Sequence, residues 1–127
     1  MLFRSAFVET SEYLKEDPFV QIKRAVPSAT LVAIISKEGM PIKVESVGDL
    51  QEAMVGSMVA ALSNLTTVML KTQMEYSILH GVGAHLIVVQ FDIDRIIALS
   101  IPEEDESNIG TYLAKIKEII KLSKGVK

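Results

Sequence analysis

The eighteen residues from Ala53 to Leu70 contain no charged side chain, and this run constrains the fold more than any other feature of the chain. On a helical wheel at about 100° per residue the run separates into two faces. One face holds large apolar side chains, namely Met54, Val55, Met58, Leu62, Leu65 and Met69. The other holds small or weakly polar ones, namely Ala53, Ser57, Ala60, Asn64 and Thr67. This pattern predicts a helix with two buried faces, in which the large side chains fill the core.

The small, uncharged face needs its own explanation, because the outer face of a surface helix is normally charged. Small side chains let a second backbone approach closely, and hydroxyl and amide groups can hydrogen-bond across the contact. We therefore expect this face to contact a second protein, with burial inside its own domain as the alternative. A membrane span needs about 20 predominantly apolar residues. The run is shorter and rich in hydroxyl and amide groups, so we expect no membrane insertion.

Composition also favours an oligomer. A chain of 127 residues suits a single domain. Apolar residues make up 49% of it, and the mean hydropathy is +0.33, which is high for a domain with so much surface relative to its volume.

Charge and cysteine content exclude several classes of function. The net charge is −3 and the basic residues are scattered except near the C-terminal end, so nucleic acid is not an expected partner. The absence of cysteine excludes disulfides, a thiolate nucleophile and a Cys-based zinc site. Residues 1–17 contain no apolar run typical of a signal peptide, and we expect a cytoplasmic protein.

The remaining pattern predicts an α/β (α+β) domain over residues 18–127, preceded by an extension over 1–17 that is possibly helical. Asp17 and Pro18 are typical of a helix start. Strands are predicted at Thr30–Ser36, Pro41–Glu45, Met74–Leu79, His85–Phe91 and Arg95–Ile101, with an amphipathic helix from Ile109 onward. Because proline cannot donate to a strand ladder, Pro41–Glu45 is expected at a sheet edge. The order α-β-β-α-β-β-β-α predicts a three-layer α-β-α sandwich around a five-stranded, mainly antiparallel sheet.

No set of residues predicts catalysis, a cofactor or a metal. His80 and His85 flank a hairpin turn, but the turn contains no acid or cysteine that would complete a metal site. The acids from Glu103 to Glu106 are interpreted as a solvated loop before the last helix. Arg4, Arg24 and Arg95 are interpreted as surface or loop residues, with a role as an arginine finger as the alternative.

One segment resembles a known family. Lys37-Glu38-Gly39-Met40-Pro41-Ile42, after an apolar strand, is similar to the acid-Gly-apolar-Pro-apolar turn of the Roadblock family, the dynein light-chain type of domain related to longin and profilin-like folds. Glu38 stands where aspartate is commoner. The long uncharged helix, three strands and closing helix follow in the family's order over residues 18–124.

The resemblance implies a dimer, formed with a second copy or a paralogue, in which the long helices pack antiparallel and edge strands join the two sheets. It places Ala53, Ser57, Ala60, Asn64 and Thr67 at the helix contact. Met74, Tyr76 and Ile78, or their alternates Glu75, Ser77 and Leu79, would lie on the joining strand. It also implies a non-catalytic scaffold or regulator of small Ras-like GTPases or adaptor complexes.

A small-molecule sensor remains an alternative function. Profilin-like folds can hold ligands against the sheet, and the methionines of the long helix could adapt around an apolar ligand.

Overall fold

The computed structural model describes residues 17–47 and 52–125, so the predicted extension over residues 1–16 lies outside the described residues. The elements are α2 (Pro18–Ala25), β1 (Leu31–Ser36), β2 (Pro41–Ser46), α3 (Glu52–Leu70), β3 (Tyr76–His80), β4 (Ala84–Gln90), β5 (Arg95–Pro102), the 3₁₀ helix η1 (Glu103–Asn108) and α4 (Ile109–Gly125). The predicted order of helices and strands is confirmed. The bounds of the other strands differ from the prediction by one residue, β3 begins two residues later than predicted, and the acidic run forms η1 instead of a loop.

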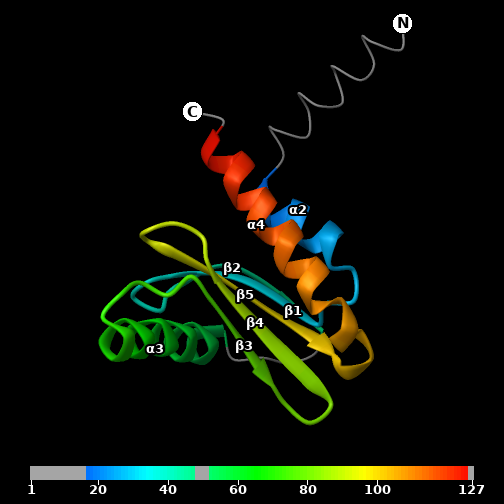
Figure 1. The fold of residues 1–127 in the computed structure, drawn as a ribbon, viewed down its shortest axis with the longest axis horizontal. Helices are drawn as coiled ribbons and strands as arrows, with labels where there is room; N and C mark the ends of the chain where they lie inside the picture. Colours follow the sequence, from blue (N-terminus) through cyan, green and yellow to red (C-terminus); the bar gives the residue numbers. More distant parts are fainter. Residues whose placement is uncertain (1–16, 48–51, 126–127) are drawn as a thin grey trace, which may run out of the picture.

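The five strands form one sheet in the order β2-β1-β5-β4-β3, and each pairing is antiparallel. The expected edge position of Pro41–Glu45 is confirmed, and β3 is the opposite edge. Figure 1 shows α3 on one face of the sheet and α2 with α4 on the other, which is the predicted three-layer arrangement. None of the helices in the described part of the chain is long and apolar enough to cross a membrane.

Local chemistry explains two of these boundaries. The side chain of Asp17 accepts a hydrogen bond from the backbone N–H of Phe19 at 2.9 Å and caps α2, with Pro18 in the first turn. In the turn between β1 and β2, Gly39 has a φ of +93°, which side chains other than glycine adopt only with strain. Its N–H donates to Ser36 at 2.9 Å and closes the turn.

Both faces of the sheet carry buried apolar side chains. The face toward α2 and α4 carries those of the larger core, including the fully buried Ile97, against which Ile116 of α4 packs. The face toward α3 carries the fully buried Ile35 and Ile96 together with Ala33 and Ala98, which are register partners on β1 and β5. Small residues on this face allow α3 to approach the sheet closely.

That close approach corrects the predicted orientation of α3. Val59 and Ala60 are buried, whereas Met58, Leu65 and Met69, which the sequence assigned to the core, are 66%, 55% and 71% exposed. A Cβ on Gly56 would lie 2.2 Å from the carbonyl oxygen of Gly39, so the helix backbone almost touches the β1–β2 turn. Of the side chains that the sequence assigned to the core, Val55 and Leu62 pack against the smaller core, and Met58, Leu65 and Met69 lie on the outer side of the helix.

Asp105 connects η1 to the rest of the domain. Its Oδ2 accepts hydrogen bonds from the Ser28 hydroxyl and, at 2.8 Å, from the Tyr112 hydroxyl, and its Oδ1 accepts one from Asn108 at 3.0 Å. These bonds, that of Ser28 first, lower the pKa of Asp105 below its ordinary value. The neighbouring acids Glu103, Glu104 and Glu106 are exposed, as expected for a solvated run.

Candidate functional site

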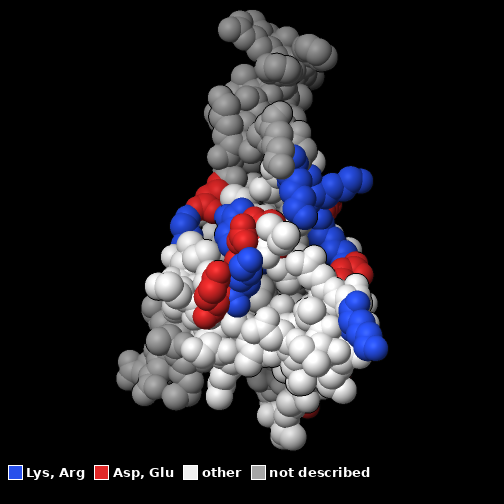
Figure 2. Space-filling view, turned by 90° about the vertical axis from the view of Figure 1, so that its left-hand side faces the viewer, with Lys and Arg blue, Asp and Glu red and all other residues white. Residues whose placement is uncertain are grey.

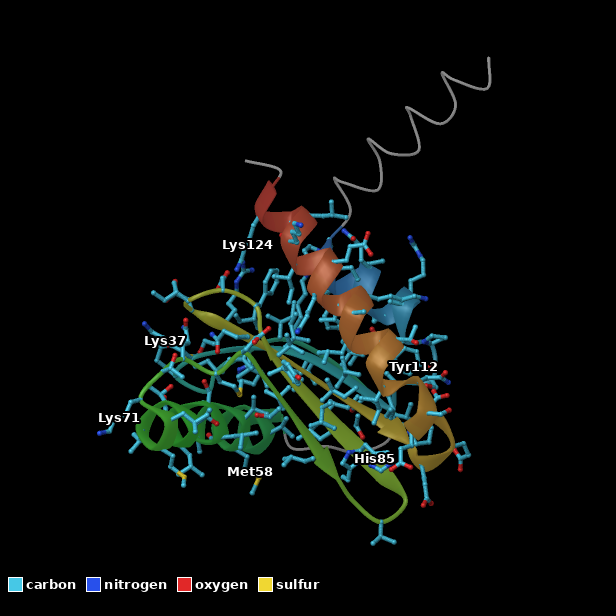
Figure 3. The ribbon with its side chains drawn as sticks, viewed as in Figure 1. Lys37, Met58, Lys71, His85, Tyr112 and Lys124 are labelled. Carbon is cyan, nitrogen blue, oxygen red and sulfur yellow. The ribbon has the colours of Figure 1, made fainter. Side chains whose placement is uncertain are left out.

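The exposed side of α3 is the first candidate surface. Met58, Ala61, Leu65, Val68 and Met69 follow one another at spacings of three, four, three and one residues, and all five are exposed. We name them the exposed α3 strip. Figure 3 shows Met58 projecting from α3 on the side away from the sheet. In Figure 2 the lower half of the molecule, where Figure 1 places α3, is largely free of charge, and charged side chains gather above it.

The residues predicted at the helix contact fall on both sides of α3. Ser57, Asn64 and Thr67 are exposed beside the strip. Ala60 is only 5% exposed and faces its own sheet, so it is not accessible to a second protein in this arrangement. The side chain of Ala53 lies outside the described residues. Sequence reasoning missed the strip itself, because an uncharged helix gives no charge pattern that distinguishes its outer face.

The free side of β3 is the second candidate surface. Gln90 donates its backbone N–H to Glu75 at 3.0 Å, and Gly81 donates to Ala84 at 2.9 Å. Because hydrogen bonding alternates along an antiparallel pair, the backbone groups of Tyr76, Ile78 and His80 point away from β4. Within the described residues no strand pairs with this side of β3.

The predicted strand residues occupy different environments. Tyr76 is 41% exposed, and the ammonium of Lys117 lies 4.6 Å from the centre of its ring. Ile78 is partly buried against the larger core, on the α4 face. Met74 precedes the strand and is buried in the smaller core, so its side chain does not reach the edge. The alternates Ser77 and Leu79 are register partners of Val88 and Leu86 on the α3 face.

The two histidines lie opposite each other, as predicted, and a third residue joins them. His80 and His85 are register partners on β3 and β4, and their Nδ1 atoms are 3.1 Å apart. Oε1 of Glu106, from η1, lies 3.5 Å from both His80 Nδ1 and His85 Nε2. The local turn contains no acid, as predicted, but the fold supplies one from 21 residues beyond His85.

Arg95, one of the candidate arginine fingers, has a local role. Arg95 binds Asp92 through Nε at 2.8 Å and Nη2 at 2.5 Å, and its guanidinium lies 4.4 Å from the centre of the Phe91 ring. Burial would raise the pKa of Asp92, but its hydrogen bonds with Arg95 and the backbone lower it overall. Arg4 lies outside the described residues.

Two hollows lie on the α2 side of the fold. One, of about 210 Å³, is lined by residues of α2, β1 and β2. Another, of about 300 Å³, lies between α2 and α4 and is lined by Gln21, Arg24, Ala25, Lys115, Glu118 and Ile119. Neither is lined by Met58 or Met69, which are exposed on α3.

Comparison with known proteins identifies the fold. Neither a protein-family model nor a characterised protein matches the chain by sequence. Among solved structures, it is similar to Myxococcus xanthus MglB, with 14% identity, a TM-score of 0.70 and coverage of 84% of this chain and 92% of that one. It is also similar to an MglB with a tetrameric arrangement, with 10% identity, a TM-score of 0.69 and coverage of 88% of this chain and 94% of that one. A Roadblock/LC7 domain from Streptomyces avermitilis is similar with 12% identity, a TM-score of 0.69 and coverage of 86% of this chain and 93% of that one. The fold that the resemblance implied is confirmed.

Proposed function

Starting from the Roadblock fold that the chain shares with these structures, we propose that it is a non-catalytic, dimeric scaffold or regulator. It associates with a second copy or a paralogue through the exposed α3 strip and β3, and it binds a small Ras-like GTPase on other faces of the dimer. The observation that supports the dimer most directly is the exposed α3 strip, an apolar surface with no charged residue.

The strip has the properties of a surface that is covered in the functional state. Four of its five residues are large apolar side chains, and α3 has no charge from Ala53 to Leu70. Continuous apolar patches on soluble proteins mark binding surfaces, because leaving them in water is unfavourable. In a two-fold dimer the same strip on both copies would pack against itself. Ser57, Asn64 and Thr67 would then form the polar border of the contact.

The free side of β3 provides a second and different kind of contact. The unpaired backbone groups of Tyr76, Ile78 and His80 are positioned to accept another antiparallel strand. Pairing β3 with the β3 of a second copy would satisfy those groups and extend the sheet. Helix packing and strand pairing together fix the orientation of the two copies more firmly than either does alone.

The dimer is tested by placing a charge in the exposed α3 strip. Leu65→Glu would desolvate a carboxylate at the contact and should weaken self-association by at least tenfold. Ile93→Glu is the matched control, because Ile93 is an exposed apolar residue in the β4–β5 turn and belongs to neither α3 nor β3. Light scattering over a protomer concentration series gives the mass and the dissociation constant. The highest concentrations should be sufficient to detect tetramers as well as dimers.

Two results would count against the proposed interface. The first is a wild-type protein that stays monomeric at high micromolar concentration, both alone and with its paralogues. The second is a Leu65→Glu variant that associates as tightly as the Ile93→Glu control, which would place the contact elsewhere.

The GTPase partner is proposed from the fold and the resemblance. If α3 and β3 form the dimer, the faces left for it include those of α2 and α4 (Figure 1). Small Ras-like GTPases of the source organism, loaded with GDP or a non-hydrolysable GTP analogue, should bind the immobilised dimer in biolayer interferometry. GTP hydrolysis by the bound GTPase should be unchanged when Arg95 is replaced by Ala, since Asp92 and Phe91 already hold that side chain. Absence of binding in both nucleotide states would refute the proposed GTPase partner but not the proposed dimer.

A further inference from the structure

We propose that His80, His85 and Glu106 form a binding site for a divalent transition metal ion, with zinc as the best match. The three residues come from β3, β4 and η1 and meet at one end of the sheet. Figure 3 shows His85 there, beside the η1 segment. All three ligands belong to one chain, although His80 also lies on β3, the strand proposed to pair with a second copy.

The donor atoms are close to the spacing that a metal requires. One donor atom from each residue lies within 4.8 Å of the other two. A tetrahedral zinc ion with bonds of about 2.0 to 2.2 Å holds its ligands about 3.3 Å apart. Glu106 Oε1 is 3.5 Å from both His80 Nδ1 and His85 Nε2, so these two pairs need only small movements.

The buried nitrogen of His85 is an independent indication. His85 is 4% exposed, and its Nε2 is enclosed by protein without a hydrogen-bond partner. A buried polar atom without a partner is unfavourable, and native structures rarely retain one without a reason. A metal ion bound at this nitrogen would satisfy it, while the Glu106 carboxylate, 3.5 Å away, would balance part of the ion's charge.

The ligand types select the metal. Two imidazoles and one carboxylate suit zinc and its neighbours in the transition series, whereas calcium and magnesium prefer oxygen ligands. Two histidines and a glutamate provide three protein ligands, and a water molecule would complete the tetrahedron. The side chains of His80 and Glu106 are 57% and 59% exposed, which gives the ion a path from solvent.

The proposed ion would join parts of the chain that are distant in sequence. His80 and His85 belong to one hairpin, and Glu106 belongs to η1, which also holds Asp105 and its bonds to Ser28 and Tyr112. Binding would therefore fix η1 onto the β3–β4 hairpin. The readouts are the zinc affinity and a rise in the thermal midpoint when zinc is added to the full chain.

The test compares ligand variants with a matched control. His80→Ala and Glu106→Gln alter exposed side chains and should leave the fold intact. Glu104→Gln removes the same charge from another exposed position on η1 and should bind zinc within about twofold of wild type. Zinc chloride is titrated in competition with a chromophoric chelator, and native mass spectrometry gives the stoichiometry. We expect one zinc ion per wild-type chain and at least a tenfold loss of affinity in each ligand variant.

Cobalt provides a spectroscopic check. Co²⁺ in a four-coordinate site of this kind should give visible absorption bands that both ligand variants lack. The proposal is overturned if the wild-type chain binds no zinc at micromolar concentration. It is also overturned if His80→Ala and Glu106→Gln bind zinc as tightly as the Glu104→Gln control. Leu65→Glu should retain zinc, so failure of the proposed dimer would not be mistaken for failure of this site.

Discussion

Replacing Gly56 by Ala should destabilise the domain, although alanine is a better helix former than glycine. The added Cβ would lie 2.2 Å from the oxygen and 3.0 Å from the carbon of the Gly39 carbonyl. Ordinary contacts begin near 3.4 Å. The atoms in the way belong to the backbone, so no side-chain rotation relieves the clash, and α3 or the β1–β2 turn must move by about 1 Å.

The expected magnitude follows from two opposing effects. Overpacking a closely packed contact costs about 1 to 3 kcal/mol, and a backbone clash belongs at the upper end of that range. Alanine in place of glycine within a helix raises the free energy of unfolding by about 1 kcal/mol. The net loss in the free energy of unfolding should be about 2 kcal/mol, which corresponds to a fall of roughly 5 to 10 °C in the thermal midpoint of a domain of this size.

Gly110→Ala is the matched control, because Gly110 also lies in a helix and nothing is within 4 Å of its added Cβ. It should stabilise the domain by up to about 1 kcal/mol. Urea unfolding followed by circular dichroism measures both variants, at a fixed protomer concentration because self-association adds to stability. If Gly56→Ala is as stable as Gly110→Ala, the close approach of α3 to the β1–β2 turn is wrong, and so is the explanation for the outward direction of Met58 and Leu65.

Two further predictions concern the packing of the larger core and the dependence of stability on acidic pH. Ile116→Ala, at a fully buried position in the larger core, should lower the free energy of unfolding by about 2 to 5 kcal/mol in the same urea assay, whereas exposed Ile93→Ala should change it by less than about 0.5 kcal/mol. The pKa of Asp105 is lowered in the folded protein from the ordinary value of 3.8, so its stabilisation is present above that value and is lost as the pH falls through the folded pKa. Thermal midpoints from pH 6 to pH 2 should show a smaller acid-induced fall for Asp105→Asn than for wild type, and equal falls would refute this assignment.

Local sequence signals were sufficient for most of the fold. The Asp17–Pro18 start, the β-branched run after Thr30 and the periodicity from Ile109 each reflect an interaction within a few residues. The hairpin partners His80 and His85 could be paired for the same reason. Such signals predict where an element begins and which residues share a face.

The orientation of α3 and the third member of the histidine cluster could not be predicted in this way. An uncharged helix has no polar stripe that marks its outer side, so the larger side chains were assigned to the core. The decisive features are Ala33 and Ala98, on neighbouring strands that are far apart in sequence, and the contact between Gly39 and Gly56. Glu106 approaches the histidines only because η1 folds back over the end of β4 and β5.

The packing of α3 also changes the meaning of its exposed methionines and leucine. The close approach of Gly56 to Gly39 limits the space on the inner side of the helix, where Val55, Val59 and Leu62 pack against the smaller core. It does not explain why the outer side is apolar, because glutamine or lysine at Met58, Leu65 or Met69 would fit the protomer equally well. The protomer gains little from apolar residues at these positions, and they leave unfavourable surface in water. A stabilising role for these side chains therefore requires a second surface that covers them. The strip, more than the small residues that first suggested a contact, is the part of α3 that supports the proposed dimer.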